Sequence, residues 1–296
     1  MNKLLLIILL CLFGFNVAIA QEMQQLEKNI DSLFASEQGD FAIVFRDLSN
    51  LENEILKNEN ETFHAASTMK TPVMIEVYKQ ANAGKLNLAD SVLIKNEFKS
   101  IQDGSLFSLD IQRDGGEKLY EQLGHKSSIK DLVVDMIIHS SNLATNIIIE
   151  LVGAENVQKT MKDLGAKNIR VLRGVEDMKA YEAGLNNSVT ALDLMILFEH
   201  LGSGTAVGKT EDKEMLTILF EQTHREIIPA LLPSNLKIAH KTGMITGVHH
   251  DSGIIFLPDG RKYVLILLSK NMKNMESGTQ MLAQVSKLVY DFMEEK

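Results

Sequence analysis

The sequence predicts an α/β sandwich, in which one antiparallel β-sheet is built from both ends of the chain, flanked by helices, and carries an inserted all-α lobe. Three observations predict this fold. Strand-like segments cluster near both ends, the long middle has a mainly helical pattern, and an amphipathic helix accompanies each group of strands. The expected strands are residues 40–46, 54–57, 236–240, 254–257 and 263–268.

The first strands are expected directly after an N-terminal helix. Residues 22–34 place apolar side chains at helical spacing. The run D-F-A-I-V-F-R at residues 40–46 is rich in β-branched and aromatic residues, which favours a strand. Residues 54–57 are its expected partner.

The remaining strands are expected near the other end of the chain. Residues 236–240 are strand-like. Residues 254–257 and 263–268 flank the turn Pro258-Asp259-Gly260, and this pattern predicts a hairpin. Residues 280–295 have the spacing of a final amphipathic helix. A helical lobe over roughly residues 65–205 is expected between the two groups of strands.

Residues 1–20 are typical of a secretory signal peptide. Lys3 supplies a positive charge, residues 4–20 are almost wholly apolar, and Ala18-Ile19-Ala20 is a small-x-small cleavage pattern. An uncleaved membrane helix is the alternative, which the short apolar run disfavours. The single cysteine, Cys11, would leave with the signal, so cysteine chemistry is not expected in the mature chain.

Charge and hydropathy restrict the partners of the mature chain. Without residues 1–20 it has 29 basic and 39 acidic residues, a net charge of −10. Because no Lys/Arg-rich run is present, nucleic acid is not an expected partner. No later apolar stretch is long enough to span a bilayer. We therefore expect an exported monomer, periplasmic or secreted, with no membrane attachment after signal cleavage.

Ser67-Thr68-Met69-Lys70 is the first motif that points to chemistry. A serine hydroxyl is a poor nucleophile without a base in hydrogen-bond reach. Residues three apart share a helix face, so Lys70 would lie beside Ser67 if a helix begins here. The S-x-x-K pattern alone is weak, because Ser127–Lys130 and Ser234–Lys237 repeat it.

Two further motifs follow in the chain. Ser140-Ser141-Asn142 comes after an apolar stretch, and by itself would suggest a cap between two helices. Lys241-Thr242-Gly243 comes directly after the strand-like residues 236–240, and by itself would suggest a strand end with a turn glycine. The first serines of the two serine motifs are 73 residues apart, and Lys241 follows Ser140 by 101 residues.

In this order and with these contexts, S-x-x-K, S-x-N and K-T-G resemble the signature of class A β-lactamases and penicillin-binding proteins. The resemblance runs from about residue 22 to the end of the chain. It implies a β-lactamase-like catalytic domain over residues 21–296, a small-molecule β-lactam substrate, and no cofactor. It also implies hydrolysis of β-lactam antibiotics, and hence antibiotic resistance.

The resemblance assigns catalytic roles to three residues. Ser67 would attack the lactam carbonyl, Lys70 would help to activate it, and Ser140 would pass a proton to the departing nitrogen. The ammonium of Lys241 near Lys70 would lower the pKa of Lys70 and favour a neutral, basic amine.

The resemblance also assigns substrate-binding roles. Asn142 would hydrogen-bond the acylamide side chain of the substrate, and Lys241 and Thr242 would meet its carboxylate. Gly243 would let the strand approach closely. The backbone N–H of Met244 would form the oxyanion hole together with that of the nucleophile.

Glu176 is the candidate activator of the deacylating water. It follows Ser140 at about the family's spacing, with Arg173 resembling the arginine that braces the loop and Asn146 the asparagine that supports the glutamate. Glu182 is a rival, because Asn186 follows it at the family's spacing from glutamate to asparagine.

Several departures from the family pattern concern deacylation. Ser141 replaces the common aspartate, and Ala180 stands where the water-holding asparagine is expected from Glu176. No obvious arginine follows K-T-G to supplement the carboxylate site; His249 and His250 lie nearby instead. These departures weaken the expectation of fast deacylation. A penicillin-binding peptidase or esterase that releases β-lactams slowly is therefore the alternative, with a non-catalytic sensor as a third hypothesis.

A metal site is not expected. Consecutive residues on a strand alternate between its faces, so His249, His250 and Asp251 cannot all bind one ion. The chain also lacks the zinc-binding motif H-E-x-x-H. It has no G-x-S-x-G elbow either, which disfavours a Ser-His-Asp hydrolase.

Overall fold

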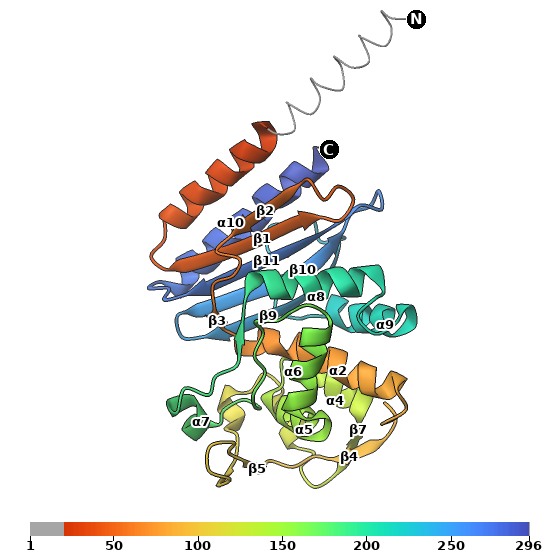
Figure 1. Ribbon diagram of the computed structural model, residues 1–296. Coiled ribbons are helices and arrows are strands. Elements are labelled where there is room, and N and C mark those ends of the chain that lie inside the picture. The colour runs from red at the N-terminus through yellow and green to blue at the C-terminus, as the bar shows by residue number, and fades with distance from the viewer. Residues whose placement is uncertain (1–20, 296) are drawn as a thin grey trace, which may run out of the picture.

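The computed structural model describes residues 21–295, so the expected signal peptide lies outside the described residues. One five-stranded antiparallel sheet has the order β2-β1-β11-β10-β9. Its strands come from both ends of the chain, which confirms the predicted fold class (Figure 1). They are β1 (Asp40–Asp47), β2 (Glu54–Lys57), β9 (Lys237–Ile245), β10 (Val248–Phe256) and β11 (Lys262–Lys270).

Within residues 21–295, three pairs of short strands lie outside this sheet. In each pair the two strands are antiparallel and come from different points between β2 and β9. The pairs are β3 (Phe63–His64) with β8 (Ser188–Val189), β4 (Ser91–Leu93) with β7 (Lys126–Ser128), and β5 (Phe98–Lys99) with β6 (Leu106–Phe107).

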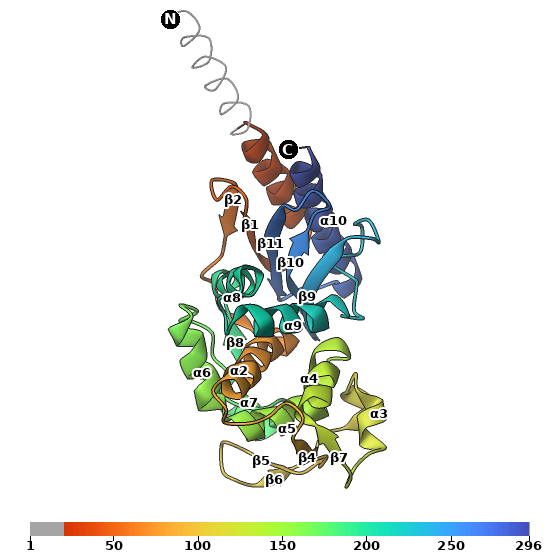
Figure 2. The ribbon, with the colours of Figure 1, turned by 90° about the vertical axis from the view of Figure 1, so that its right-hand side faces the viewer.

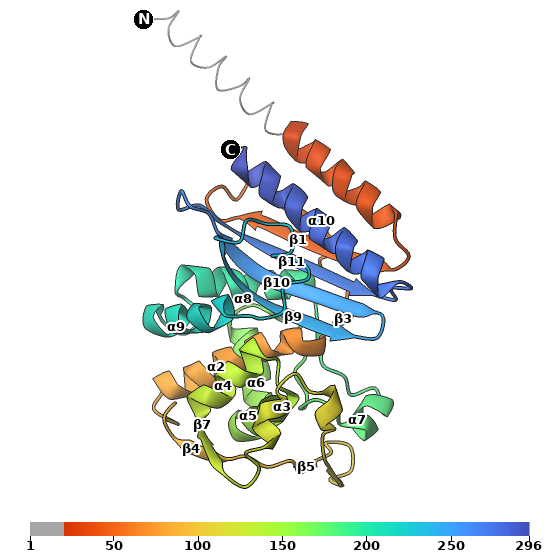
Figure 3. The ribbon, with the colours of Figure 1, turned by 180° about the vertical axis from the view of Figure 1, so that it is seen from behind.

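The helices fall into two groups around the sheet. A helix over residues 21–35 and α10 (Met275–Glu294) cover one face together (Figure 3). The remaining helices are on the other side of the sheet or below it, as the side view in Figure 2 shows. They are α2 (Lys70–Asn82), α3 (Glu117–Tyr120), α4 (Ile129–Ile138), α5 (Asn142–Val152), α6 (Ala154–Asp163), α7 (Met178–Glu182), α8 (Ala191–Ser203) and α9 (Lys209–Phe220), with the 3-10 helices η1 (Ala66–Met69) and η2 (Ile111–Arg113).

The alternation of side chains along β1 explains why the sheet has two apolar faces. Phe41, Ile43 and Phe45 are buried in the core shared with α10, whereas Ala42 and Val44 are buried in the core shared with the other helices. Burial of apolar surface on both faces stabilises the sheet by about 25 cal/mol per Å². Both ends of the chain are therefore needed to complete either core.

Strand β9 is longer than the sequence predicts. Lys241-Thr242-Gly243 lies within it rather than after it, because β10 starts at Val248 and pairs as far as Ile245. The expected hairpin is present, since β10 and β11 are antiparallel neighbours around Pro258-Asp259-Gly260. K-T-G is thus held on an extended edge strand beside η1.

Candidate active site

Ser67 lies in the 3-10 turn η1, immediately before α2. Its side chain is half-buried and lines a cleft, while Thr68 and Met69 are buried. Lys70 is the first residue of α2, and Pro72 falls in the first helical turn, where its missing N–H costs no hydrogen bond. The sequence therefore begins a helix where the motif requires one.

Lys70 is fully buried, and three oxygen atoms surround its amine. The Nζ atom donates to the Ser140 carbonyl oxygen at 2.7 Å and to Asn142 Oδ1 at 3.0 Å, and lies 3.2 Å from Ser140 Oγ. Burial, and then the charge of Lys241, hold the pKa of Lys70 well below its usual value. Asp114 and Glu176 oppose this shift without reversing it.

Ser140 lies in the short turn between α4 and α5. Its φ is 57°, in the left-handed region that L-residues other than Asn and Asp rarely adopt. Ser141 follows as the N-cap of α5, with its side chain accepting a hydrogen bond from the N–H of Ala144. Serine at position 141 therefore serves as the cap of α5, and the turn directs the Ser140 hydroxyl toward both lysines.

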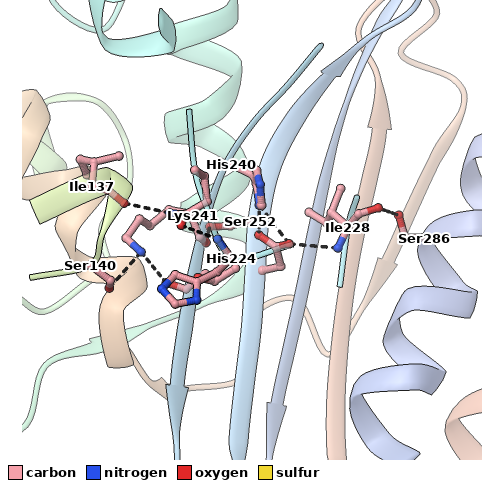
Figure 4. Close-up of polar contacts among 11 residues, drawn as sticks. Ile137, Ser140, His224, Ile228, His240, Lys241, Ser252 and Ser286 are labelled. Carbon is pink, nitrogen blue, oxygen red and sulfur yellow. Dashed lines mark hydrogen bonds and ion pairs between the residues drawn. The ribbon is translucent and has the colours of Figure 1, made fainter. Parts of the chain in front are cut away.

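Lys241 approaches the same hydroxyl from β9. Its Nζ donates to Ser140 Oγ at 3.1 Å and to the Thr242 carbonyl at 3.1 Å (Figure 4). Ser252 on β10 donates to the Lys241 carbonyl at 3.1 Å. Burial lowers the pKa of Lys241 to about 7, and the nearby Asp251 carboxylate limits the fall.

Gly243 is required by a close approach of two backbones. A Cβ at this position would lie 2.8 Å from the Ser67 nitrogen and 3.0 Å from the Thr68 nitrogen. Because real Cβ atoms do not come this close, any other residue would displace β9 from η1. Met244, the next residue, is 64% exposed and lines the cleft.

Glu176 faces Asn142 across the cleft. Its Oε1 accepts a hydrogen bond from Asn142 Nδ2 at 2.9 Å. Glu176 has a φ of 61° and lines the cleft. Its rival, Glu182, is exposed at the end of α7 and is not among the residues that line the cleft. The structure therefore places Glu176 at the cleft and Glu182 away from it.

Two side chains brace the loop that carries Glu176. Asn146 in α5 bonds Val175 twice, accepting from its N–H at 2.6 Å and donating to its carbonyl at 3.0 Å. Arg173 donates to the carbonyls of Leu185 and Gly174, each at 2.9 Å. Asn146 thus links the loop to α5, and Arg173 links two parts of the loop to each other.

The structure shows where the residues that depart from the family pattern lie. Ala180 is fully buried, and Asp177, the N-cap of α7, accepts from its N–H at 3.0 Å. His249 and His250 diverge: His249 contacts Thr279 in α10, whereas His250 is buried toward β3. Within residues 21–295 no group of three His, Cys, Asp or Glu side chains is arranged to hold a metal ion.

Backbone strain marks the same place. The non-glycine residues with positive φ in the described part of the chain are Asn58, Ala66, Ser140, Glu176 and Asn271. The two asparagines tolerate this conformation, but the other three do so at a cost of about 1 to 3 kcal/mol each. Ala66 directly precedes Ser67, Ser140 carries the hydroxyl that both lysines contact, and Glu176 carries the carboxylate of the loop.

Three further residues of the site were not predicted. Asp114 accepts from the N–H groups of Asn142 and Leu143, each at 2.8 Å, and so fixes the start of α5. Asn187 donates to Met69 Sδ at 2.9 Å, and His64 lines the cleft beside Ser67. These residues carry no local motif, so only the tertiary contacts reveal them.

The cleft between β9, η1 and the loop has a volume of about 490 Å³. It is lined by both polar and apolar side chains, which suits a small organic molecule. The polar residues that line the cleft include Ser67, Arg113, Asn142, Arg173, Glu176 and Thr246.

Within residues 21–295 no helix has the length and hydropathy to cross a membrane.

The family model described as "Beta-lactamase enzyme family" matches residues 25–293. Extended-spectrum β-lactamase PER-1 of Pseudomonas aeruginosa is 25% identical over 90% of this chain and 87% of its own length. A β-lactamase structure from Sphaerobacter thermophilus is 24% identical with a TM-score of 0.78, covering 92% of this chain and 97% of that one. A PBP-A variant, titled as an acyl-enzyme complex with penicillin G, has the same identity, TM-score and coverage.

The family model spans nearly all of the described residues, and the solved structures share the fold of this chain. This chain belongs to the β-lactamase enzyme family.

Proposed function

We propose that this protein hydrolyses β-lactam antibiotics through a covalent acyl-enzyme on Ser67. The observation that carries the proposal is the convergence of two buried lysines on one serine hydroxyl, Ser140 Oγ, beside the cleft that Ser67 lines. A hydroxyl donates one proton and accepts others, so Ser140 can accept from a charged Lys241 while it donates to a neutral Lys70.

Acylation would begin with proton transfer from Ser67 to the neutral amine of Lys70. The Ser67 oxygen attacks the lactam carbonyl carbon and forms a tetrahedral intermediate. When this collapses, the C–N bond breaks and Ser140 gives its proton to the departing nitrogen. Lys70 then returns its proton to Ser140, so every group ends in its starting charge state.

Binding of the substrate would use the groups around this hydroxyl. Lys241 and Thr242 meet the carboxylate, and Asn142 donates to the acylamide carbonyl. The backbone N–H groups of Ser67 and Met244 stabilise the oxyanion. A single such donor contributes about 10²- to 10³-fold to the rate. The contact of Gly243 with η1 supports this placement of the two N–H groups.

Deacylation would use Glu176 as the general base. Its carboxylate takes a proton from a water molecule, the hydroxide oxygen attacks the ester carbonyl, and Ser67 leaves with a proton returned by the base. The strained backbone of Glu176 and its position across from Asn142 support this role over Glu182.

The test is turnover of a chromogenic cephalosporin by the purified mature protein, followed by intact-mass analysis of the protein during the reaction. We expect sustained hydrolysis and a transient mass increase equal to one substrate. Folded protein that is never acylated would contradict the proposal.

A second function is favoured by a specific observation. Ala180 is buried and offers no amide beside Glu176, so no side chain at that position holds the deacylating water. A penicillin-binding peptidase or esterase of the same fold would be acylated at Ser67 and released slowly. A mass increase that persists for hours in the unmodified protein, without turnover, would favour it.

We also propose that residues 1–20 direct export to the periplasm or the medium and are then removed. We further propose that the exported enzyme, by hydrolysing β-lactams, makes the host resistant to these antibiotics. Expression in a susceptible bacterium should raise the inhibitory concentration of a penicillin, and N-terminal sequencing of the exported protein should begin at Gln21. Retention of Met1 would contradict cleavage.

A further inference from the structure

His64 contacts the backbone of the nucleophile turn. It is a half-buried residue of β3 that lines the cleft, and its Nδ1 accepts a hydrogen bond from the N–H of Ala66 at 3.1 Å. A backbone N–H can only donate, so Nδ1 carries no proton and the ring is neutral with its hydrogen on Nε2. Burial, and then Arg173, lower the pKa of His64, which favours this neutral ring.

The bonded residue is the strained one. Ala66 has a φ of 44°, a conformation that is strained for alanine and persists only where the surroundings hold it. The N–H of Ala66 is fixed by His64, while the next backbone segment is fixed by the approach of Gly243 to the Ser67 nitrogen. The direction of the Ser67 N–H therefore depends on both contacts.

A second histidine holds the first. His250 is fully buried in β10, and its Nε2 lies 2.9 Å from the carbonyl oxygen of His64. The N–H of Ser269 donates to His250 Nδ1 at 3.1 Å, so the ring hydrogen is on Nε2 and points at His64. Burial lowers the pKa of His250 to about 4, so this ring is neutral at working pH. Each donor in this chain of hydrogen bonds has one acceptor.

We propose that His64 and His250 are positioning residues for acylation, which hold Ala66 in its left-handed conformation so that the Ser67 N–H points into the oxyanion hole. This inference rests on the proposed function for its kinetic consequence. Neither ring exchanges a proton with the substrate; His64 acts through the backbone of Ala66, and His250 acts through the carbonyl of His64.

The test compares His64→Asn with His64→Gln. The side-chain oxygen of asparagine can take the place of Nδ1, whereas that of glutamine extends toward the position of Nε2. We expect His64→Asn to be acylated by a penicillin within about threefold of the unmodified rate. His64→Gln should be about 10²-fold slower, as for a misplaced oxyanion donor. Single-turnover acylation followed by intact mass gives the rates, and thermal unfolding checks that both variants fold.

A second pair guards against misfolding at position 64. His250→Gln keeps a donor near Nε2 and should retain acylation, whereas His250→Leu leaves the carbonyl of His64 unpaired and should slow it. Equal acylation rates for the two members of each pair, at equal thermal stability, would overturn the inference.

Hydrogen exchange of the Ala66 amide separates this inference from the proposed function. If the unmodified protein is not acylated at all, the proposed function fails, and the exchange still decides the placement. Protection in His64→Asn but not in His64→Gln supports the hydrogen bond, and equal protection in both overturns it.

Discussion

The wall of the cleft that carries Ser67, Lys70 and Lys241 differs from the wall that carries Glu176 in what holds it in place. The first wall is made of η1, α2 and β9; Lys70 and Lys241 in it are fully buried, and the backbones of η1 and β9 approach closely at Gly243. The second wall is a loop, tied to α5 through Asn146. The comparison teaches that the groups proposed for acylation are part of the core, whereas the proposed deacylation base depends on a few hydrogen bonds.

The largest effect is expected at the nucleophile. Ser67→Ala should remove covalent labelling and reduce turnover by about 10⁴-fold or more, because no other group can form the ester. Ser234→Ala is the matched control, since it removes the exposed serine of another S-x-x-K and should leave both unchanged. Labelling by a fluorescent penicillin checks this. Labelling that survives in Ser67→Ala would move the nucleophile elsewhere.

A loss of about 10³-fold in deacylation is expected for Glu176→Gln, since general-base catalysis is removed while acylation continues. The acyl-enzyme should accumulate and be visible as a stable mass increase. Glu182→Gln, on the exposed end of α7, should behave as the unmodified protein. The opposite result for the two variants would make Glu182 the base.

A third variant tests the tie between the loop and α5. Asn146→Ala should slow deacylation by about 10- to 100-fold, because a small displacement of the base is costly to the rate. Acylation should remain within about twofold of normal, since Lys70 and Ser140 make no bond to Asn146 in the described chain. Pre-steady-state measurement separates the two steps. Equal losses in both steps would show that the two walls are not independent.

The pH dependence of kcat/KM tests the first wall of the cleft, which carries Lys70 and Lys241. Lys70 must be neutral to accept a proton and Lys241 must be charged to bind a carboxylate. As pH rises above the Lys241 pKa of about 7, its charged form declines, so kcat/KM should fall about tenfold per pH unit. Lys241→Arg stays charged and should move this alkaline limb to higher pH. Identical profiles would argue against titration of Lys241.

The smallest effect is expected on the surface of the loop. Lys179 in α7 donates to Asp103 at 2.7 Å in an exposed ion pair. Because solvent screens exposed ion pairs, they contribute little to stability, so Lys179→Gln should change deacylation by less than about twofold. A larger loss, measured as kcat, would show that the loop is held from outside as well as by Asn146.

Sequence reasoning reached the fold and the residues with local motifs. Patterns at the two ends predicted the sheet, because alternation and turn chemistry are local properties. The structure brings Lys70, Ser140 and Lys241 together as the three motifs suggest. Asp114 and His64 escaped notice because they act on backbone groups of other elements. The extent of β9 was also underestimated, since pairing with β10 decides it.

The origin of the sheet from both ends of the chain has a consequence for how the protein folds. β1 pairs with β11, so Asp40 can pair with Lys270 only after nearly the whole chain has been synthesised (Figure 1). Contacts between such distant residues slow folding. K-T-G in β9 meets η1 across a similar separation. We therefore expect the oxyanion hole to form late, and a chain cut before β11 to lack both the sheet and any reactivity toward penicillin.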